Sequence, residues 1–180
     1  MQREERKIIY LRSFMKAFSE NEIDKTTIKK MAKAADMSEA SIYQYFKNKD
    51  EIIVDCVKLY FNNLQTELFP VLQSAKFTMD QKVEKCLKFA KRSKGQAKFA
   101  IQVLTSPSYG KLCAPVTQEF LQNLIPVCDT IAEQQSVPQS SAYSFLLLLF
   151  SVLYSNGIVG DDKTLNVQVG FLQEMLEHAC

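Results

Sequence analysis

The sequence has few residues that break helices. It contains five glycines and five prolines among 180 residues. Glycine and proline punctuate turns, so long stretches free of both argue against a turn-rich β protein. Because 47% of the residues are hydrophobic, the chain can also bury a sizeable core. These features predict an all-α protein, and the spacing of apolar residues and breaks along the chain indicates about nine helices.

Residues typical of catalytic and metal sites are also scarce. The single histidine is His178, and we find no glycine-rich phosphate loop, nucleophile motif or metal-spaced cluster. We therefore expect no enzymatic activity, no metal and no cofactor. The cysteines are isolated and odd in number, which is typical of buried thiols in a reducing, cytoplasmic compartment, although a thiol sensor is an alternative. They are Cys56, Cys86, Cys113, Cys128 and Cys180.

Charge is absent from residues 134–160, which raises the question of a membrane span. The dense apolar part, residues 142–154, is shorter than the roughly 20 residues that a bilayer needs. The uncharged stretch also contains Pro138 and Asn156. The amino terminus is too charged for a signal peptide. We therefore expect a buried helix at residues 139–156 and no membrane partner.

The small net charge of +2 hides an uneven distribution. Residues 1–50 hold eleven Lys and Arg against eight Asp and Glu, whereas the remainder holds eleven against twelve. The amino-terminal part is therefore mildly basic and the rest is close to neutral.

Apolar spacing and capping residues predict three helices in the amino-terminal part. Apolar residues recur at three- and four-residue steps over residues 3–19. Thr26 or Thr27 can cap a second helix, and Ser38 can cap a third. Asp36 lies between the last two, and aspartate tolerates the left-handed backbone that a tight turn needs. A helix, a tight turn and a second helix form a helix-turn-helix arrangement.

The third predicted helix, residues 38–46, has two contrasting sides. On a helical wheel Ile42 and Phe46 fall on one side, and Ala40, Tyr43 and Gln44 fall on the other. A small residue and an amide suit a DNA major groove, where glutamine can bond an adenine edge. Tyrosine hydroxyls and nearby lysines can reach phosphates. Two amphipathic helices with solvated polar sides are the alternative interpretation.

The full stretch TTIKKMAKAADMSEASIYQYFKNKDEII, residues 26–53, closely resembles the DNA-binding segment of the TetR family of bacterial transcriptional regulators. The match includes the double threonine, the serine before the recognition helix, the Tyr-x-x-Phe pattern and the following Lys-x-Lys-Asp. It is specific over residues 5–60. Asp36 and Asn21 stand where family members usually have glycine. The resemblance implies DNA proximity for Thr26, Thr27, Ser38, Glu39, Ala40, Ser41, Tyr43, Gln44, Tyr45, Lys47 and Lys49.

The resemblance also implies a domain organisation and partners. Residues 1–48 are expected to form the helix-turn-helix domain and residues 49–180 a helical effector-binding and dimerisation domain. The protein is then expected to be a DNA-binding regulator, most often in this family a repressor released from a palindromic operator by a small molecule. Candidate lining residues of the effector pocket, for each of which plain core is the alternative interpretation, are Phe61, Leu64, Phe89, Phe99, Val103, Tyr109, Phe120, Leu124 and Cys128.

The two carboxy-terminal helices, about residues 139–156 and 163–179, are expected to form a homodimer. The first is apolar around most of its circumference, which a single core cannot easily cover. The second groups apolar residues on one face. They are Leu165, Val169, Leu172, Met175 and Leu176. An adaptor that binds DNA and docks a protein, without any small molecule, is the alternative function.

Breaks between the later helices are expected at three places. Pro70 and Gly95 can each end a helix, and the sequence SPSYG, residues 106–110, can form a loop. Lysines cluster between Lys82 and Lys98, which indicates a solvated helix face or a site for an acidic ligand or partner.

Overall fold

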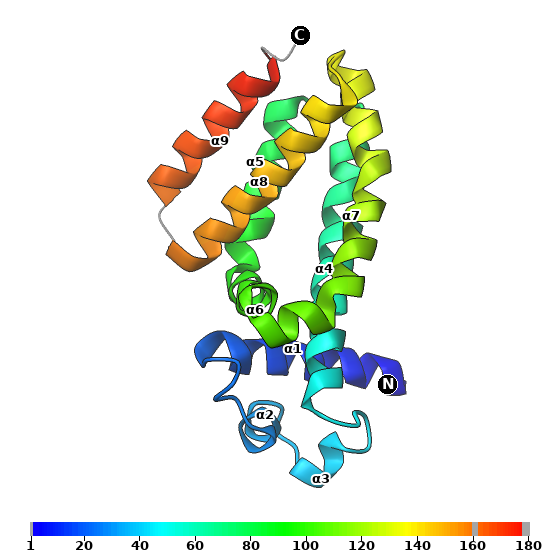
Figure 1. Ribbon diagram of the computed structural model, residues 1–180, viewed down its shortest axis with the longest axis vertical. Coiled ribbons are helices and arrows are strands. Elements are labelled where there is room, and N and C mark those ends of the chain that lie inside the picture. The colour runs from blue at the N-terminus through cyan, green and yellow to red at the C-terminus, as the bar shows by residue number, and fades with distance from the viewer. Residues whose placement is uncertain (1, 160–161, 178–180) are drawn as a thin grey trace. The chain divides into compact units, whose positions relative to one another are not determined.

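The computed structural model describes residues 2–159 and 162–177, and within them it contains nine α-helices and no strand (Figure 1). This confirms the predicted all-α fold. The helices are α1 (Arg3–Glu20), α2 (Ile28–Ala34), α3 (Glu39–Ile42), α4 (Lys49–Gln73), α5 (Met79–Arg92), α6 (Lys94–Thr105), α7 (Pro107–Gln135), α8 (Gln139–Val159) and α9 (Asp162–Glu177).

The chain forms two compact units. The first consists of Met1–Asn62 and Gly95–Gln118, and the second of Asn63–Lys94 and Glu119–Cys180. The start of α4, most of α6 and the start of α7 therefore pack together with α1, α2 and α3. The expected functional boundary after residue 48 stays a prediction, because packing groups the residues in a different way.

Side-chain caps begin the two short helices of the first unit. The backbone N–H of Lys30 donates to the hydroxyl of Thr27 at 3.3 Å. The N–H of Ser41 donates to the hydroxyl of Ser38 at 3.0 Å. These bonds satisfy donors that have no partner inside the helix, so each helix starts where its cap lies. The predicted caps are confirmed.

Two turn residues that replace glycine behave differently. Asp36, between α2 and α3, has φ 51°, as expected for a left-handed turn. Asn21, after α1, has φ −132° and is extended, so this position does not need a left-handed backbone. Asn21 instead uses its side chain, because its Nδ2 donates to the carbonyl of Ala17 at 2.9 Å.

Aromatic packing forms the core of the first unit. Phe14 of α1 meets Phe46 edge to face at 5.7 Å, and Phe18 stacks on Phe99 of α6 at 5.2 Å between ring centroids. Ile42 is also fully buried. Because these side chains come from segments far apart in sequence, the core fixes α3 and the residues after it against α1.

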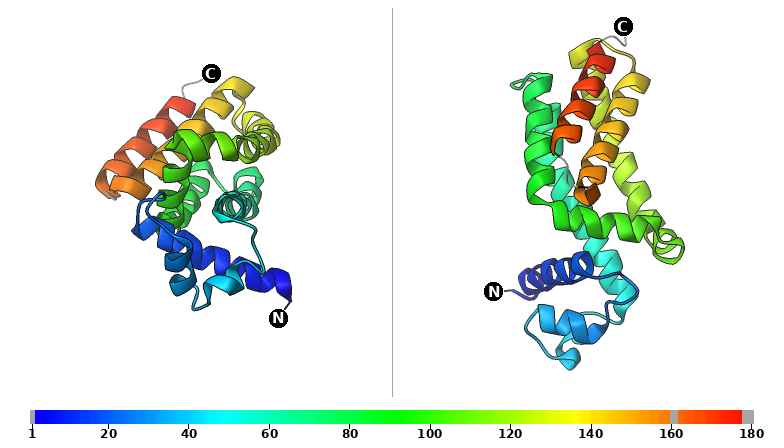
Figure 2. Two further views of the ribbon diagram at one scale, coloured as in Figure 1. Left: turned by 60° about the horizontal axis from the view of Figure 1, so that its bottom comes forward. Right: turned by 90° about the vertical axis from the view of Figure 1, so that its left-hand side faces the viewer.

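Three aromatic rings link helices of the second unit. Phe120 of α7 lies 5.9 Å from Phe69 of α4 and 6.0 Å from Phe150 of α8. Helix α8 packs against α9 and α5, as the views show (Figure 1, Figure 2). Phe145 and Leu146 of α8 are buried as well. Helix α8 therefore contributes to the core of this unit, as its uncharged sequence indicates.

The helix breaks differ from the expected ones. Helix α4 continues through Pro70 to Gln73, and α7 begins at Pro107, where a proline costs no internal hydrogen bond. The break between α5 and α6 falls at Ser93.

Gly110 lies inside α7, and a Cβ there would come within 2.8 Å of the carbonyl oxygen of Leu104. Glycine thus permits the close approach of α7 to the end of α6.

The lysine cluster of α5 is less uniform than its sequence indicates. Lys82 is 1% exposed, and its Nζ donates to Oε1 of Gln134 on α7. Lys88 pairs with Glu84 at 2.6 Å. Lys82 therefore belongs to the core of the second unit, whereas the exposed members lie on a solvated face.

Among the residues that the structure describes, no single helix is both long and apolar enough to cross a membrane. Helix α7 and residues 139–153 of α8 satisfy that criterion only as a pair, with a bend of 116° between them.

Candidate nucleic-acid interface

Residues 38–46, the recognition segment, are helical for only one turn. Helix α3 ends at Ile42, so the expectation of a helix as far as Phe46 is wrong. The chain continues as a tighter turn, in which the N–H of Gln44 donates to Ser41 at 3.2 Å and that of Tyr45 to Ile42 at 2.9 Å. These bonds connect residues three apart, the 3₁₀ pattern that is common at helix ends.

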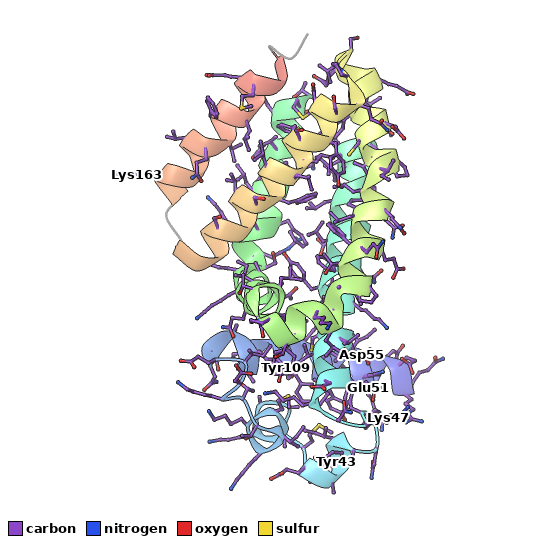
Figure 3. All side chains as sticks on the ribbon, viewed as in Figure 1. Tyr43, Lys47, Glu51, Asp55, Tyr109 and Lys163 are labelled. Atoms are coloured by element: carbon purple, nitrogen blue, oxygen red, sulfur yellow. The ribbon has the colours of Figure 1, made fainter. Side chains whose placement is uncertain are left out.

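The recognition segment nevertheless separates its two sides as the sequence predicts. Ile42 is 0% and Phe46 is 2% exposed. Tyr43 is 56% exposed and lies at the margin of the first unit (Figure 3), and Ala40 and Gln44 are exposed too. A buried apolar side thus supports an outward side that carries a methyl group, a phenol and an amide.

Several other predicted DNA-binding residues are also accessible. Thr27, Glu39 and Lys47 are exposed. The hydroxyls of Ser38 and Ser41 bond each other at 2.7 Å at the start of α3. Ser38, Glu39 and Ser41 belong to the recognition segment itself, whereas Lys47 follows it directly and Thr27 lies before α2.

Two of the predicted DNA-binding residues are engaged within the protein. Thr26 is 0% exposed, and its hydroxyl donates to the carbonyl of Glu22 at 3.0 Å. The ring of Tyr45 meets that of Tyr10 edge to face at 5.1 Å, with the Arg3 guanidinium 5.7 Å from its centroid. These contacts give both residues a structural role in the first unit.

Lys49, a third predicted DNA-binding residue, ties the start of α4 to the loop before α2. Its Nζ donates to the carbonyl of Ile23 at 2.6 Å and lies 5.8 Å from the centroid of the Tyr109 ring. Burial lowers the pKa of Lys49, while Asp24 and Asp50 oppose that shift. Helix α4 is also capped, because Asn48 Oδ1 accepts from the N–H of Glu51 at 2.9 Å.

Sequence reasoning missed two cations of α1 that contact the recognition segment. Arg3 donates from Nη2 to the carbonyl of Gln44 at 2.7 Å. Lys7 pairs with Asp55 of α4 at 2.7 Å and lies 5.2 Å from the centroid of the Phe46 ring. Their four-residue spacing places them on one helix face, but no local sequence pattern predicts which residues, about 40 positions away, they contact.

The residues expected to line an effector pocket divide between the two units. Phe61, Phe99, Val103 and Tyr109 lie in the first unit; Leu64, Phe89, Phe120, Leu124 and Cys128 lie in the second. All are buried except Tyr109, which is intermediate in exposure. Burial is equally consistent with core and with lining residues, so their role stays a prediction.

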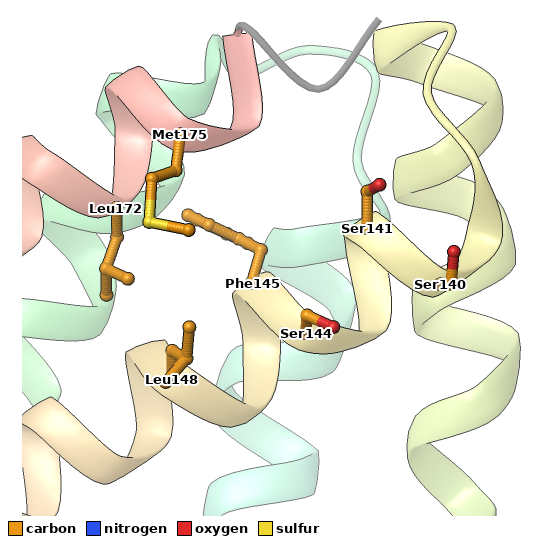
Figure 4. A pocket seen from close by; sticks show the side chains of 7 residues that line it. All are labelled: Ser140, Ser141, Ser144, Phe145, Leu148, Leu172 and Met175. Atoms are coloured by element: carbon orange, nitrogen blue, oxygen red, sulfur yellow. The ribbon is translucent and has the colours of Figure 1, made fainter.

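A pocket of about 210 Å³ lies elsewhere, between α8 and α9. Phe145 and Leu148 of α8 face Leu172 and Met175 of α9, with hydroxyls along one edge (Figure 4). Those hydroxyls belong to Ser140, Ser141 and Ser144. The pocket is open to solvent on the surface of the two helices that are expected to dimerise.

The expected dimerisation surface exposes Met175 of the predicted α9 face, but its other exposed side chains are not the predicted ones. Val169 and Leu172 of α9 are buried within the unit. Val167, Phe171 and Met175 are 74%, 62% and 48% exposed, and Leu148 of α8 is 43% exposed. Residues 178 and 179 and the side chains of Leu165 and Leu176 lie outside the described part. Helix α9 therefore packs on α8 through one side and presents apolar groups on another.

Burial keeps the described cysteines protonated at neutral pH. It raises the pKa of Cys86 to about 12 and those of Cys113 and Cys128 to about 11, and it raises that of Cys56 well above its usual range. Cys180 and His178 lie outside the described residues. Because thiolate is the reactive form, these four thiols are poorly suited to sensing oxidants.

Comparisons with known proteins agree with this geometry. Residues 12–56 match the family model described as bacterial regulatory proteins, tetR family. No curated protein is significantly similar to the chain.

Solved structures share the fold over almost the whole chain. Salmonella enterica GusR is 16% identical with a TM-score of 0.70, covering 98% of both chains. FadR from Bacillus subtilis in complex with stearoyl-CoA is 15% identical with a TM-score of 0.70, covering 96% of this chain and 98% of its own. NalD of Pseudomonas aeruginosa, the secondary repressor of the MexAB-OprM multidrug efflux pump, is 14% identical with a TM-score of 0.64, covering 96% and 95%. The family match and the shared fold confirm the resemblance to the TetR family.

Proposed function

Since the amino-terminal segment is that of the TetR family of bacterial transcriptional regulators, we propose that this protein binds DNA in a sequence-specific way as a homodimer. It acts as a repressor on a palindromic operator and is released by a small-molecule effector. The observation that carries the proposal is the outward side of the recognition segment. Ala40, Tyr43 and Gln44 are exposed there over a buried apolar support.

The outward side chains have complementary tasks in a major groove. The Gln44 amide can donate to and accept from an adenine edge, and the methyl group of Ala40 permits close approach. Tyr43 and Lys47 reach phosphates and set the register of the protein on the duplex. The DNA-contacting set is Thr27, Ser38, Glu39, Ala40, Ser41, Tyr43, Gln44 and Lys47. Thr26, Tyr45 and Lys49 act by holding this set in place.

Dimerisation follows from the small size of one recognition segment. A single helix-turn-helix contacts few phosphates, so such domains bind as pairs to two half-sites. The exposed apolar side chains of α8 and α9 support a four-helix interface with a second copy. Its central contacts come from Leu148, Val167, Phe171 and Met175, which would otherwise remain in water.

Release by an effector depends on thermodynamic linkage between ligand binding and DNA binding. A ligand that binds one dimer geometry better shifts the equilibrium toward it and changes the spacing of the recognition segments. The bound stearoyl-CoA in Bacillus subtilis FadR supports an effector with an apolar part. The buried aromatic residues of this chain supply suitable contacts for such a ligand.

The proposal is tested by selecting duplexes from a random pool with the full-length protein. We expect a palindromic consensus with two half-sites about one helical turn, or a multiple of it, apart. Tyr43→Ala should lose most of the affinity, whereas Tyr43→Phe should lose only the contribution of the hydroxyl. Recovery of no consensus, by a protein shown to be folded and dimeric, contradicts the proposal.

The alternative is an adaptor whose carboxy-terminal helices dock another protein. The exposed Val167 and Phe171 favour it to the extent that they remain uncovered in solution. Adding small apolar molecules to the complex of protein and selected duplex separates the two functions, because only the ligand-released repressor dissociates.

A further inference from the structure

Four side chains of α1 contact the last residues of the recognition segment. Successive members are four, three and four residues apart in the sequence, so they lie on one face of the helix. We call them the α1 row, and its members are Arg3, Lys7, Tyr10 and Phe14. Their partners are the three consecutive residues Gln44, Tyr45 and Phe46.

Arg3 makes two contacts within this row. Its Nη2 donates to the carbonyl oxygen of Gln44 at 2.7 Å, and its guanidinium carbon lies 5.7 Å from the centroid of the Tyr45 ring. The same ring meets Tyr10 edge to face at 5.1 Å. A planar guanidinium that bonds a carbonyl and contacts an aromatic ring is held in one orientation.

The recognition segment needs such support at this point. Regular helix ends at Ile42, so Gln44 lies two residues past the last helical residue. Carbonyl groups at a helix end lack internal partners, and arginine side chains commonly bond them. The backbone of the residue that carries the outward amide is therefore fixed by α1 as well as by α3.

The first turn of α1, which carries Arg3, is fixed by neighbouring contacts. The N–H of Gln2 donates to Oε2 of Glu5 at 2.8 Å, which closes the first turn of α1. Lys7, one turn later, pairs with Asp55 of α4 at 2.7 Å. The first turns of α1 thus connect α4 with the end of the recognition segment.

We propose that Arg3 is a positioning residue for DNA sequence selectivity, which acts by fixing the backbone of Gln44 and not as a phosphate contact. This inference rests on the proposed DNA-binding function. It assigns the first turn of α1 a part in base recognition that its charge alone would not give it. A phosphate contact adds affinity for every sequence equally, whereas a support for Gln44 adds affinity only for the preferred one.

The first experiment needs no DNA. Amide hydrogen exchange is compared in the free full-length wild type, in Arg3→Ala and in Arg6→Ala, which removes an exposed charge from the same turn. We expect exchange at residues 44–46 to be about tenfold faster in Arg3→Ala and unchanged in Arg6→Ala. Equal exchange in all three proteins overturns the inference.

The second experiment measures binding to a selected duplex and to a scrambled duplex of the same length over a range of salt concentrations. We expect Arg3→Ala to lower the ratio of the two affinities about tenfold and to leave the salt slope unchanged. Equal weakening on both duplexes, with a salt slope smaller by about 0.9 for each phosphate that the arginine neutralises, identifies a phosphate contact and overturns the inference. An unchanged affinity ratio overturns it as well.

A third measurement asks whether Arg3 acts through Gln44. Adding Gln44→Ala to Arg3→Ala should cost less selectivity than Gln44→Ala costs in the wild type, because the two changes remove one function. Additive losses contradict the inference. If the wild type itself prefers no duplex, the proposed function fails, and that result is distinct from a selective wild type whose selectivity survives Arg3→Ala.

Discussion

At the scale of single residues, Gln44 is the side chain whose removal should most directly change the sequence preference of DNA binding. Its amide is exposed and its backbone is held by a side chain of α1. We expect Gln44→Ala to weaken binding to the preferred duplex by about 1–3 kcal/mol and to relax the preference at one base pair of each half-site. Gln118→Ala, which removes an exposed amide elsewhere in the first unit, is the matched control. Repeating the duplex selection with each variant checks this, and an unaltered consensus for Gln44→Ala excludes base reading by that residue.

Lys82 gives the stability of the protein a dependence on pH. Burial lowers its pKa from the usual 10.5, so the native state holds the proton less tightly than the unfolded state. Raising the pH through the folded pKa of Lys82 toward 10.5 therefore raises the free energy of unfolding. Lowering the pH again removes that gain in stability. Urea unfolding should show that wild type gains stability relative to Lys82→Met as the pH is raised from neutral toward 10.5. Lys58→Met, which removes an exposed lysine, is the matched control.

At the scale of elements, two lysines near the start of α4 look equivalent in the sequence but have different surroundings in the structure. Lys47 is exposed, whereas Lys49 donates to the carbonyl of Ile23 at 2.6 Å. We expect Lys49→Met to lower the free energy of unfolding by about 1–2 kcal/mol, because it removes a charged hydrogen bond. Lys47→Met should leave stability unchanged and reduce the salt slope of DNA binding by about 0.9 for each phosphate that the lysine neutralises. Thermal unfolding and salt titration of both variants provide the check, and an identical effect of the two changes contradicts it.

Local elements were predictable because their causes are local. The caps of α2 and α3 and the left-handed turn at Asp36 depend on residues within four positions, so the sequence displays them directly. The two sides of the recognition segment also follow from spacing alone. The end of α3 at Ile42 was not predictable, since packing of Phe46 on Phe14 decides how the chain leaves that helix.

Long-range contacts at the candidate site were not predictable for a related reason. The partners of Arg3 and Lys49 lie 41 and 26 residues away in the chain. Nothing in the sequence distinguishes these cations from lysines that remain free to bind phosphate. The same limit applies to the packing of residues 95–118 with the amino-terminal helices, because it depends on which apolar faces meet.

At the scale of the whole molecule, the exposed side of α9 decides whether the protein is a dimer. Phe171 is 62% exposed, Val167 is 74% exposed, and both belong to a helix whose other side is buried on α8. Covering them with a second copy removes apolar surface from water, at roughly 25 cal/mol for each Å² buried. A carboxylate in such an interface loses its hydration without gaining a partner. We therefore expect Phe171→Glu to convert the dimer to a folded monomer.

Sedimentation equilibrium of the wild type, Phe171→Glu and Gln122→Glu tests this expectation. Gln122 is exposed on α7 of the same unit, so its variant introduces the same charge away from α8 and α9. Gln122→Glu should remain dimeric, and Phe171→Glu should bind the selected palindrome far more weakly, because one recognition segment alone contacts too few phosphates. A dimer that survives Phe171→Glu would move the interface away from this side of α9. In that case Val167 and Phe171 would be surface for another protein, and the adaptor function would gain the support that the repressor loses.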